Sequence, residues 1–298
     1  MIGVIFIFDG KTKVYSLLGY PVEHSFSPAM QNAAFEAAGL NCVYVPFSPR
    51  PEELKAAIAG IRALGIAGAN VTVPHKETVI PFLDGLTEAA AAYGAVNTII
   101  NRGGRLTGHN TDGAGFIQAL KEDCGFDPAG GTAMVFGAGG SARAVVLALA
   151  RSGCPGVALV NRSIAKAEKI AGFIRDATGV QVEVFEWESG NKELAVWAQK
   201  AALMVNCTSI GMSGGAEAVF PLPDELPGSG QLAYDVVYNP PHTAFMQRAE
   251  RNGAASANGL SMLLRQGALS FEFWTGVTAP LEAMRGALAL MEKGRTSS

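Results

Sequence analysis

The chain has 298 residues, which predicts two domains at the roughly 150 residues typical of one domain. Its 23 basic and 26 acidic residues give a formal net charge of −3, and no block of like charge occurs, which argues against nucleic acid or an anionic membrane surface as a partner. Apolar residues make up 49% of the chain, which excludes global disorder. Glycine is in excess, with 36 residues or about 12% against a usual ~7%, and predicts many turns and close backbone approaches.

No apolar stretch reaches the ~20 residues that a membrane span needs, so we expect no membrane segment. The opening MIGVIFIFDG lacks a basic leader and a cleavage site, and it predicts a first strand rather than a signal peptide. Cys42, Cys124, Cys154 and Cys207 form no CxxC pair, which favours a reduced, cytoplasmic protein. The histidines are scattered and no metal-ligand spacing occurs, so we expect no metal site.

The first hundred residues alternate short strands with helices. A strand over Val14–Leu18 ends at a Gly-Tyr-Pro breaker. Ser27 is placed to cap a helix that begins at Pro28 and that Gly39 ends. The predicted inward stripe of this helix, at helical spacing, is Met30, Ala33, Ala34 and Ala37.

The alternation continues with a strand over Val43–Phe47, a helix from about Pro51 to Gly65, and a strand over Ala67–Val73 that stops at Pro74. The apolar positions predicted to face inward on that second helix are Leu54, Ile58, Ile61 and Leu64. Elements of this length and order predict a largely parallel α/β sheet.

A second unit begins near residue 113. The strand Thr132–Phe136, the helix Ser141–Ser152 and the strand Val157–Val160 form one βαβ unit of about thirty residues. Further predicted strands lie at Val180–Trp187, Leu203–Asn206 and Leu232–Val237. The Gly- and Pro-rich segment 213–230 predicts a surface loop.

The turn between the first strand and helix of this unit carries a dinucleotide fingerprint of the form G-x-G-x-x-A. The first glycine permits the tight turn, the second lets backbone N–H groups approach a pyrophosphate, and the final alanine lets helix and strand pack closely. The residues are Gly137, Ala138, Gly139, Gly140, Ser141 and Ala142. A glycine-rich turn without a ligand is the alternative interpretation.

The end of the next strand indicates which dinucleotide binds. NAD sites place a carboxylate there for the ribose 2′-hydroxyl, whereas this chain has Asn161, Arg162 and Ser163, with Lys166 shortly after. Arg162 can bind a 2′-phosphate through two parallel hydrogen bonds and Lys166 can add a point charge. A solvated basic surface is the alternative, but a cationic first helical turn opposes the helix dipole, so we expect NADP there.

Polar side chains in the first half cluster where strands end, which is where ligands bind in open α/β sheets. They lie at Ser25 and Ser27 and in the segments 70–76, 94–98 and 108–113. Individually each suits a cap, a turn or a solvated surface. Together their hydroxyl, amide, ammonium and carboxylate groups suit a polyhydroxylated small molecule.

With these segments in view, the chain resembles the shikimate dehydrogenase family along almost its whole length. The segments that carry the resemblance are GYPVEHSFSPAMQN (19–32), NVTVPHK (70–76), GAVNT (94–98), GHNTDG (108–113), GAGGSAR (137–143), NRS (161–163), NCTSIGM (206–212), DVVYNPPHT (235–243) and NGLSMLLRQGA (258–268). The resemblance implies reversible NADPH-dependent reduction of 3-dehydroshikimate to shikimate, in the pathway to aromatic amino acids. It also implies two α/β domains with the active site in the cleft between them.

The fold that follows is a substrate-binding and catalytic domain over 1–112 with a mainly parallel sheet, and a Rossmann NADP-binding domain over 113–259. Residues 260–298 would return to the first domain. The substrate is a small molecule, and a homodimer stays open.

The resemblance also implies roles for individual residues. Lys76 and Asp112 would be the catalytic pair, and a positioned lysine can stabilise and protonate the carbonyl oxygen that gains charge during hydride transfer. The implied substrate contacts are Ser25, Ser27 and Tyr238 around the carboxylate, with Thr72, Asn97 and Gln266, besides the catalytic pair, around the ring hydroxyls. Thr208, Met212 and Gly259 would line the nicotinamide.

One departure concerns Gln31-Asn32, where the family often has His-Asn. Gln31, with the Phe-Trp-Thr-Gly run at 273–276, is similar to the quinate/shikimate dehydrogenase branch, but that branch usually has an acidic residue where this chain has Asn161-Arg162-Ser163. A quinate/shikimate dehydrogenase that uses either cofactor is therefore the competing enzyme. A non-catalytic NADP-binding sensor and a two-domain NADP dehydrogenase for a different carbonyl or imine also stay open, and neither predicts both the Lys76–Asp112 pair and the hydroxyl-binding set.

Overall fold

The computed structural model describes residues 8–212 and 220–296. The chain divides into two compact units, Met1–Thr111 with Leu264–Ser298, and Asp112–Leu263. The expected strand at the N-terminus falls mainly on residues 1–7, outside the described residues, and residues 8–10 are not in a strand. None of the described helices combines the length and apolar character that a bilayer span requires.

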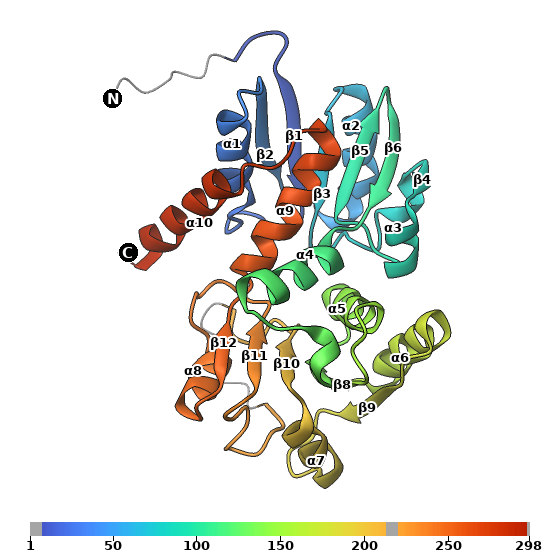
Figure 1. The fold of residues 1–298 in the computed structure, drawn as a ribbon. Coiled ribbons are helices and arrows are strands. Elements are labelled where there is room, and N and C mark those ends of the chain that lie inside the picture. Colours follow the sequence, from blue (N-terminus) through green and yellow to red (C-terminus); the bar gives the residue numbers. More distant parts are fainter. Residues whose placement is uncertain (1–7, 213–219, 297–298) are drawn as a thin grey trace. The chain divides into compact units, whose positions relative to one another are not determined.

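The first unit is built on a six-stranded sheet in the order β2-β1-β3-β5-β6-β4 (Figure 1). Five strands run in one direction, and β5 alone is antiparallel to both of its neighbours. Its strands are β1 (Lys13–Leu18), β2 (Cys42–Phe47), β3 (Gly68–Val71), β4 (Gly85–Leu86), β5 (Thr98–Arg102) and β6 (Arg105–His109). Its helices are α1 (Ser27–Ala37), α2 (Leu54–Ala63), α3 (Glu88–Tyr93), α9 (Leu260–Thr275, crossing the unit boundary) and α10 (Leu281–Thr296).

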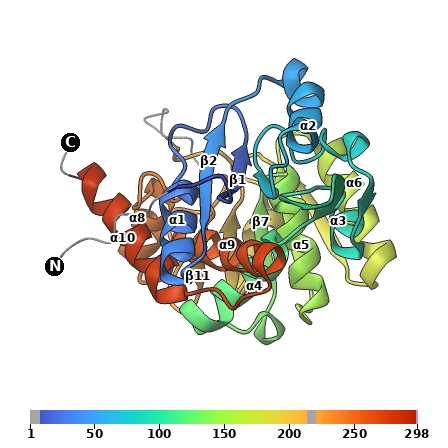
Figure 2. The same cartoon turned by 90° about the horizontal axis from the view of Figure 1, so that it is seen from above.

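Alternate residues of β1 point to opposite faces of this sheet, so each face has its own core. Leu18 belongs to the cluster that α2 covers with Ile58 and Ile61. On the other face Tyr15 packs against Phe35 of α1 and Trp274 of α9, with ring centroids 5.1 and 5.0 Å apart. Helix α10 packs beside α1, as the ribbon shows from two directions (Figures 1 and 2). The last two helices of the chain therefore complete the first unit.

The second unit has an all-parallel six-stranded sheet in the order β12-β11-β10-β7-β8-β9. Its strands are β7 (Ala133–Phe136), β8 (Val157–Asn161), β9 (Val182–Glu186), β10 (Leu203–Asn206), β11 (Leu232–Asp235) and β12 (Ala255–Ala257). Its helices are α4 (Asp112–Gln118), α5 (Gly140–Arg151), α6 (Ile164–Thr178), α7 (Lys192–Lys200) and α8 (Ala244–Arg251). Strands β7 and β10 are wholly buried, as parallel strands covered on both faces must be.

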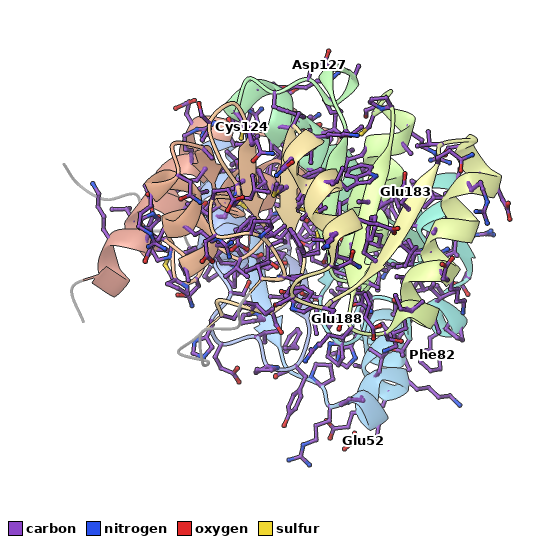
Figure 3. All side chains as sticks on the ribbon, turned by 90° about the horizontal axis from the view of Figure 1, so that it is seen from below. Glu52, Phe82, Cys124, Asp127, Glu183 and Glu188 are labelled. Atoms are coloured by element: carbon purple, nitrogen blue, oxygen red, sulfur yellow. The ribbon has the colours of Figure 1, made fainter. Side chains whose placement is uncertain are left out.

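The edge strand β9 exposes Glu183, which Figure 3 labels at the surface of the unit. Charged side chains on an edge strand oppose pairing with a further strand. Three short 3-10 turns, at Pro51–Glu53, Ile80–Phe82 and Pro128–Gly130, and a π-helical turn at Ala119–Asp123 complete the described elements.

Several local predictions are wrong. Ser27 is not the cap of α1: Phe26 holds that position, and Ser27 donates its backbone N–H to Ser25 Oγ at 3.2 Å. Ala37 and Leu64 were expected to face inward but are exposed: Ala37 is the last residue of α1, and Leu64 follows the last residue of α2. The described part of segment 213–230 has no helix or strand, as predicted for a loop, but it is only partly at the surface. The side chains of Phe220, Leu222 and Leu226 are buried in the core with residues of α7 and α8; residues 213–219 lie outside the described residues.

Candidate active site

The strand directions of the first unit gather several of the predicted substrate residues at one edge of its sheet, whereas Asp112 and Tyr238 belong to the second unit. Strands β1 and β3 are parallel neighbours, so their carboxyl ends lie together. Because β5 runs the other way, its amino end lies at that same edge, where Thr98 pairs with Asn70 on one side and His109 on the other. Polar residues at the ends of four strands, β1, β3, β5 and β6, therefore reach one edge, which agrees with where ligands bind in such sheets.

Ser25, Ser27, Thr72 and Lys76 follow β1 and β3 at this edge. The backbone N–H of Thr72 donates to the Leu18 carbonyl at 2.8 Å, which joins the ends of the two strands. The Lys76 carbonyl accepts a hydrogen bond from Val96 N at 2.8 Å, so the backbone of Lys76 is fixed beside the residue that precedes Asn97.

Asn97 is held by hydrogen bonds at both ends of its amide group. Its Oδ1 accepts from Thr111 N and Thr98 Oγ1, each at 2.9 Å. Its Nδ2 donates to Thr111 Oγ1 at 2.8 Å and to Gln266 Oε1, on α9, at 3.2 Å. The structure thus brings Asn97 and Gln266 together although 169 positions separate them in sequence.

Gln31 contributes indirectly to the same region. Its side chain is fully buried, and its Nε2 donates to the Gly267 carbonyl at 2.9 Å, one residue after Gln266. A side chain closed off from solvent acts on the backbone of α9 rather than on a ligand in a solvent-filled site. The presence of Gln31 where the family often has histidine therefore affects the position of α9.

In the second unit the glycine fingerprint lies at the point where the strand order reverses. Strand β7 is flanked by β8, the next strand in the chain, and by β10, so the switch lies between β7 and β10. Gly137 has φ +109°, and a Cβ there would lie 3.1 Å from Thr208 Cγ2. Gly139 caps α5 without a side-chain hydrogen bond, and a Cβ there would meet no atom within 4 Å.

These features fit a dinucleotide pyrophosphate. The positive φ of Gly137 is accessible to glycine without strain and would be strained for any residue with a side chain. Gly139 leaves space in front of the first N–H groups of α5. Ala138, Gly140, Ser141 and Ala142 complete the turn into α5, where Ala142 is fully buried against the sheet.

The residues predicted to select the 2′-phosphate follow β8. Asn161 ends the strand, and its Nδ2 donates to the Ser163 carbonyl at 2.9 Å, which shapes the turn. Ser163 caps α6 without a side-chain hydrogen bond, and Arg162 and Lys166 are exposed. The turn therefore presents two cations and no carboxylate of its own, in agreement with a phosphate rather than a bare hydroxyl.

The remaining predicted residues of the second unit follow β10, β11 and β12, except for Asp112, which comes before the first strand of this unit. Thr208 follows β10, and its N and Oγ1 both donate to Asn206 Oδ1, at 3.0 and 2.7 Å. Met212 is 53% exposed, Tyr238 follows β11, and Asp112 is the first residue of α4. Within the described residues no group of three or more His, Cys, Asp or Glu side chains is placed to hold a metal ion.

Gly259 is fixed by a close backbone approach, since a Cβ there would overlap the Val236 carbonyl oxygen. We expect Gly259→Ala to lower the free energy of unfolding by about 3 kcal/mol, the upper end of overpacking, because backbone cannot move aside as a side chain does. The measurement is the urea midpoint of unfolding of Gly259→Ala, compared with that of the control variant Gly172→Ala. Gly172 is the control because its added Cβ would meet only Arg175, at 3.8 Å. Equal midpoints for Gly259→Ala and the wild type would contradict this packing.

Asp235, at the end of β11, is a residue that sequence reasoning missed. It is fully buried, and its Oδ1 accepts from Asn206 Nδ2 and Val237 N, both at 2.9 Å. Its Oδ2 accepts from Thr243 Oγ1 at 2.7 Å, and Thr243 caps α8. Burial raises the pKa of Asp235 to about 6, although the hydrogen bonds from Thr243, Val237 and Asn206 oppose the rise. Asp235 thus joins the segments that carry Thr208 and Tyr238.

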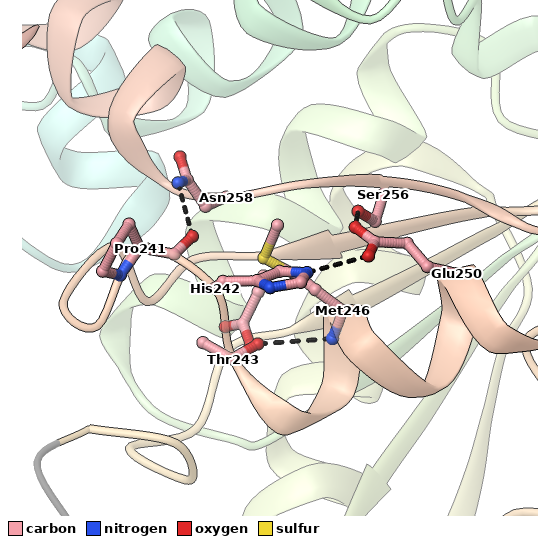
Figure 4. A network of polar contacts seen from close by, with 8 residues as sticks. Pro241, His242, Thr243, Met246, Glu250, Ser256 and Asn258 are labelled. Atoms are coloured by element: carbon pink, nitrogen blue, oxygen red, sulfur yellow. Dashed lines mark hydrogen bonds and ion pairs between the residues drawn. The ribbon is translucent and has the colours of Figure 1, made fainter.

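The other end of segment 235–243 is held by hydrogen bonds at the surface (Figure 4). His242 Nε2 lies 2.8 Å from Glu250 Oε2, and Ser256 Oγ donates to Glu250 Oε1 at 2.6 Å. Asn258 Nδ2 donates to the Pro241 carbonyl at 2.8 Å, which anchors the residue before Gly259. Segment 235–243 is therefore bonded at both ends, and Tyr238 lies between the two anchors.

The raised pKa of Asp235 predicts a pH-dependent stability. The folded state holds this proton more tightly than the unfolded chain, whose carboxyl titrates near 3.8, so the contribution of Asp235 to stability is fully present below pH 4 and is lost as the pH rises through about 6. A shift of about two units is worth about 3 kcal/mol. In Asp235→Asn, which stays neutral, this fall is absent from unfolding curves recorded between pH 4 and 7. Asp176→Asn, on the exposed surface of α6, keeps the wild-type slope. Parallel curves for wild type and Asp235→Asn would refute the assignment.

The arrangement defines the class of protein. The second sheet has the order 3-2-1-4-5-6 of a dinucleotide-binding fold, with a glycine-rich turn (residues 137–142, called the glycine cradle below) at its switch point. The first sheet gathers a lysine and amide and hydroxyl groups at the edge where the carboxyl ends of β1 and β3 lie. This is the organisation of a dinucleotide-dependent dehydrogenase with a separate substrate domain.

Comparison with known proteins identifies the family. Residues 17–99 match the model of the shikimate dehydrogenase substrate binding domain, and residues 259–289 match that of the shikimate 5'-dehydrogenase C-terminal domain. The shikimate dehydrogenase (NADP(+)) of Desulforamulus reducens is 48% identical over 94% of this chain and 96% of its own. The chain belongs to the shikimate dehydrogenase family.

Solved structures agree with this assignment. The Thermus thermophilus shikimate 5-dehydrogenase in complex with NADP(H) and shikimate is 36% identical, with a TM-score of 0.82 over 94% of this chain and 99% of that one. The Listeria monocytogenes enzyme in complex with shikimate and NAD is 35% identical, with a TM-score of 0.87 over 94% of this chain and 98% of that one. The predicted family and two-domain α/β fold are confirmed.

Proposed function

We propose that this protein catalyses the reversible, NADPH-dependent reduction of 3-dehydroshikimate to shikimate in aromatic amino acid biosynthesis. The observation that carries the proposal is the sequence similarity to NADP-dependent shikimate dehydrogenases over nearly the whole chain. Each unit supports it separately: the first offers Lys76 with hydroxyl- and amide-bearing side chains at one sheet edge, and the second offers the glycine cradle with Arg162 beyond it.

In the proposed reaction, NADPH supplies a hydride to the C=O carbon of the substrate. The Lys76 ammonium group stabilises the charge that develops on the carbonyl oxygen and donates the proton that completes the alcohol. Asp112 is the proposed partner of that ammonium group; it follows Thr111, which is bonded to Asn97 through both its N and its Oγ1. In the oxidation direction the same groups accept the proton.

Substrate recognition is assigned to the remaining polar residues. Ser25, Ser27 and Tyr238 donate to the carboxylate, while Thr72, Asn97 and Gln266 bind the ring hydroxyls. For the cofactor, residues 137–142 hold the pyrophosphate, and Asn161, Arg162, Ser163 and Lys166 hold the adenosine end. Thr208, Met212 and Gly259 line the nicotinamide. The domains follow these roles, with 1–112 and 260–298 binding substrate and 113–259 binding NADP.

The test is an absorbance assay at the nicotinamide band that pairs shikimate and quinate with NADP and NAD. We expect shikimate with NADP to give the highest kcat/KM. Quinate with NAD as the best pair would favour the quinate/shikimate dehydrogenase instead. Tight NADP binding without turnover of either acid would indicate a sensor.

We further propose a cytoplasmic location. All four cysteines lie in the described part of the chain and none is paired in a disulfide, which suits a reducing compartment. A homodimer is a separate proposal, which sedimentation velocity of the purified protein tests directly.

A further inference from the structure

A cluster of polar side chains is buried between the first sheet and α9. It consists of Asn70, Thr98, Thr111 and Ser270, which are 7%, 0%, 1% and 0% exposed. We call these four residues the Asn70 cluster. Buried polar groups are costly unless they are hydrogen-bonded, so a cluster of this kind requires a structural or functional reason.

Ser270 Oγ lies within hydrogen-bond distance of the other three residues of the cluster. It accepts from Asn70 Nδ2 at 3.0 Å and lies 2.8 Å from Thr98 Oγ1 and 3.3 Å from Thr111 Oγ1. It also donates to the Gln266 carbonyl, one turn earlier on α9, at 3.0 Å. One hydroxyl therefore connects β3, β5, the segment after β6 and α9.

Asn70 anchors the cluster from the sheet. Its Oδ1 accepts from Tyr44 OH at 2.8 Å, which leaves Nδ2 to donate to Ser270 Oγ and, at 3.3 Å, to Thr98 Oγ1. Its Nδ2 also lies 3.0 Å from the Asn97 carbonyl. The tyrosine bond thus fixes which end of the Asn70 amide faces the cluster.

The cluster in turn fixes the side chain of Asn97. The N–H of Thr111, which can only donate, bonds to Asn97 Oδ1, and the hydroxyl of Thr98 donates to the same oxygen. A reversed amide would place the Asn97 NH₂ against the Thr111 N–H, so the orientation of the amide is fixed. Asn97 Nδ2 then faces Thr111 Oγ1 and Gln266 Oε1. Two residues assigned to the ring hydroxyls are thus oriented by buried groups behind them.

We propose that Ser270, acting through Thr98, Thr111 and Asn70, is a positioning residue that orients Asn97 and Gln266 for a polyhydroxylated cyclic substrate. The proposal rests on the proposed function, because it assumes that these two amides bind the ring hydroxyls. Geometric precision of this kind is supplied by locked groups behind the contacting residues. The cluster lies in the first unit and the glycine cradle in the second, so its loss acts on substrate affinity and not on cofactor affinity.

The experiment measures KM for shikimate, KM for NADP and the unfolding midpoint in a set of variants. We expect Ser270→Ala and the near-isosteric Thr98→Val each to raise KM for shikimate about tenfold, with KM for NADP within twofold of the wild type. Thr98→Ser keeps the hydroxyl and restores KM for shikimate to within about threefold. If Ser270→Ala fails to fold, the two Thr98 variants carry the same comparison.

The control is Ser16→Ala. Ser16 is a fully buried serine of β1, and its hydroxyl has no hydrogen-bond partner among the described residues. We expect this variant to leave both KM values unchanged.

The results separate the possible failures. Unfolding midpoints that fall while KM for shikimate stays within twofold would overturn the proposal and assign the cluster to stability alone. An equal rise in both KM values would also overturn it. Wild-type protein that fails to oxidise shikimate at all would refute the proposed function itself, before any variant is compared.

Discussion

Replacing Lys76 with alanine lowers kcat for shikimate oxidation by about 10²–10⁴-fold, the range that general acid–base groups typically contribute. The loss appears in kcat because the lysine acts on charge that develops only as the hydride transfers. Steady-state assays in both directions, together with an NADP titration, provide the measurement. Affinity for NADP stays unchanged, since Lys76 belongs to the first unit and the glycine cradle to the second.

The matched control is Lys55→Ala, which removes an exposed lysine of α2 in the same unit. We expect wild-type kinetics from it. A Lys76→Ala enzyme with near wild-type kcat would show that another group donates the proton.

Removing the Arg162 side chain lowers kcat/KM for NADP by about 10- to 100-fold and leaves kcat/KM for NAD unchanged. The reason is that a hydrogen bond to a charged group contributes ~1.5–3 kcal/mol, and NAD lacks the 2′-phosphate that would receive it. Arg162→Ala is assayed with both cofactors at saturating shikimate, so the values for NADP and NAD are compared within one protein preparation.

Arg151→Ala supplies the control for net charge, because Arg151 is an exposed arginine at the other end of the βαβ unit, in the last turn of α5. If Arg162→Ala lost activity with both cofactors equally, its contribution would be to the turn after β8 and not to the phosphate.

Much of the second unit could be predicted from the sequence because its signals are local. The strand Leu203–Asn206 was predicted with the bounds that the structure shows, and the glycine turn follows β7 as its spacing indicated. A buried parallel strand is a short apolar run, and a turn that needs a positive φ requires glycine. Neither depends on distant residues.

The first unit was harder because its site depends on contacts between distant segments. No sequence pattern indicated that β5 runs against its neighbours and thereby brings Thr98 opposite Asn70. Ser270 was not singled out from the sequence, because three of its hydrogen-bonding partners, on Asn70, Thr98 and Thr111, come close only once α9 is placed. The one available signal was a serine on the inward face, one turn beyond Gln266.

The capping and burial errors have the same origin. Ser27 precedes a proline and fits a cap by type, but Ser25 supplies the hydroxyl. Phe220 lies in a segment rich in glycine and proline, yet its ring packs against Phe136 and Phe245 at 5.1 and 4.6 Å. Amino-acid composition indicates the local conformation of a segment, but it does not show which of its side chains are buried by distant parts of the chain.

The split of the first unit between the two ends of the chain affects the order of synthesis. Domains usually fold as units while the ribosome extends the chain, with the amino-terminal one first. Here the first 111 residues lack Trp274 and Phe271 until α9 has been synthesised, so Tyr15 and Phe35 have no aromatic partners from α9 before then. The second unit ends at residue 263, so all of its residues are synthesised before the last part of the first unit. A chain stalled before α9 is synthesised would therefore expose the aromatic side chains of β1 and α1, so the synthesis of α9 is the step that ends this risk of aggregation.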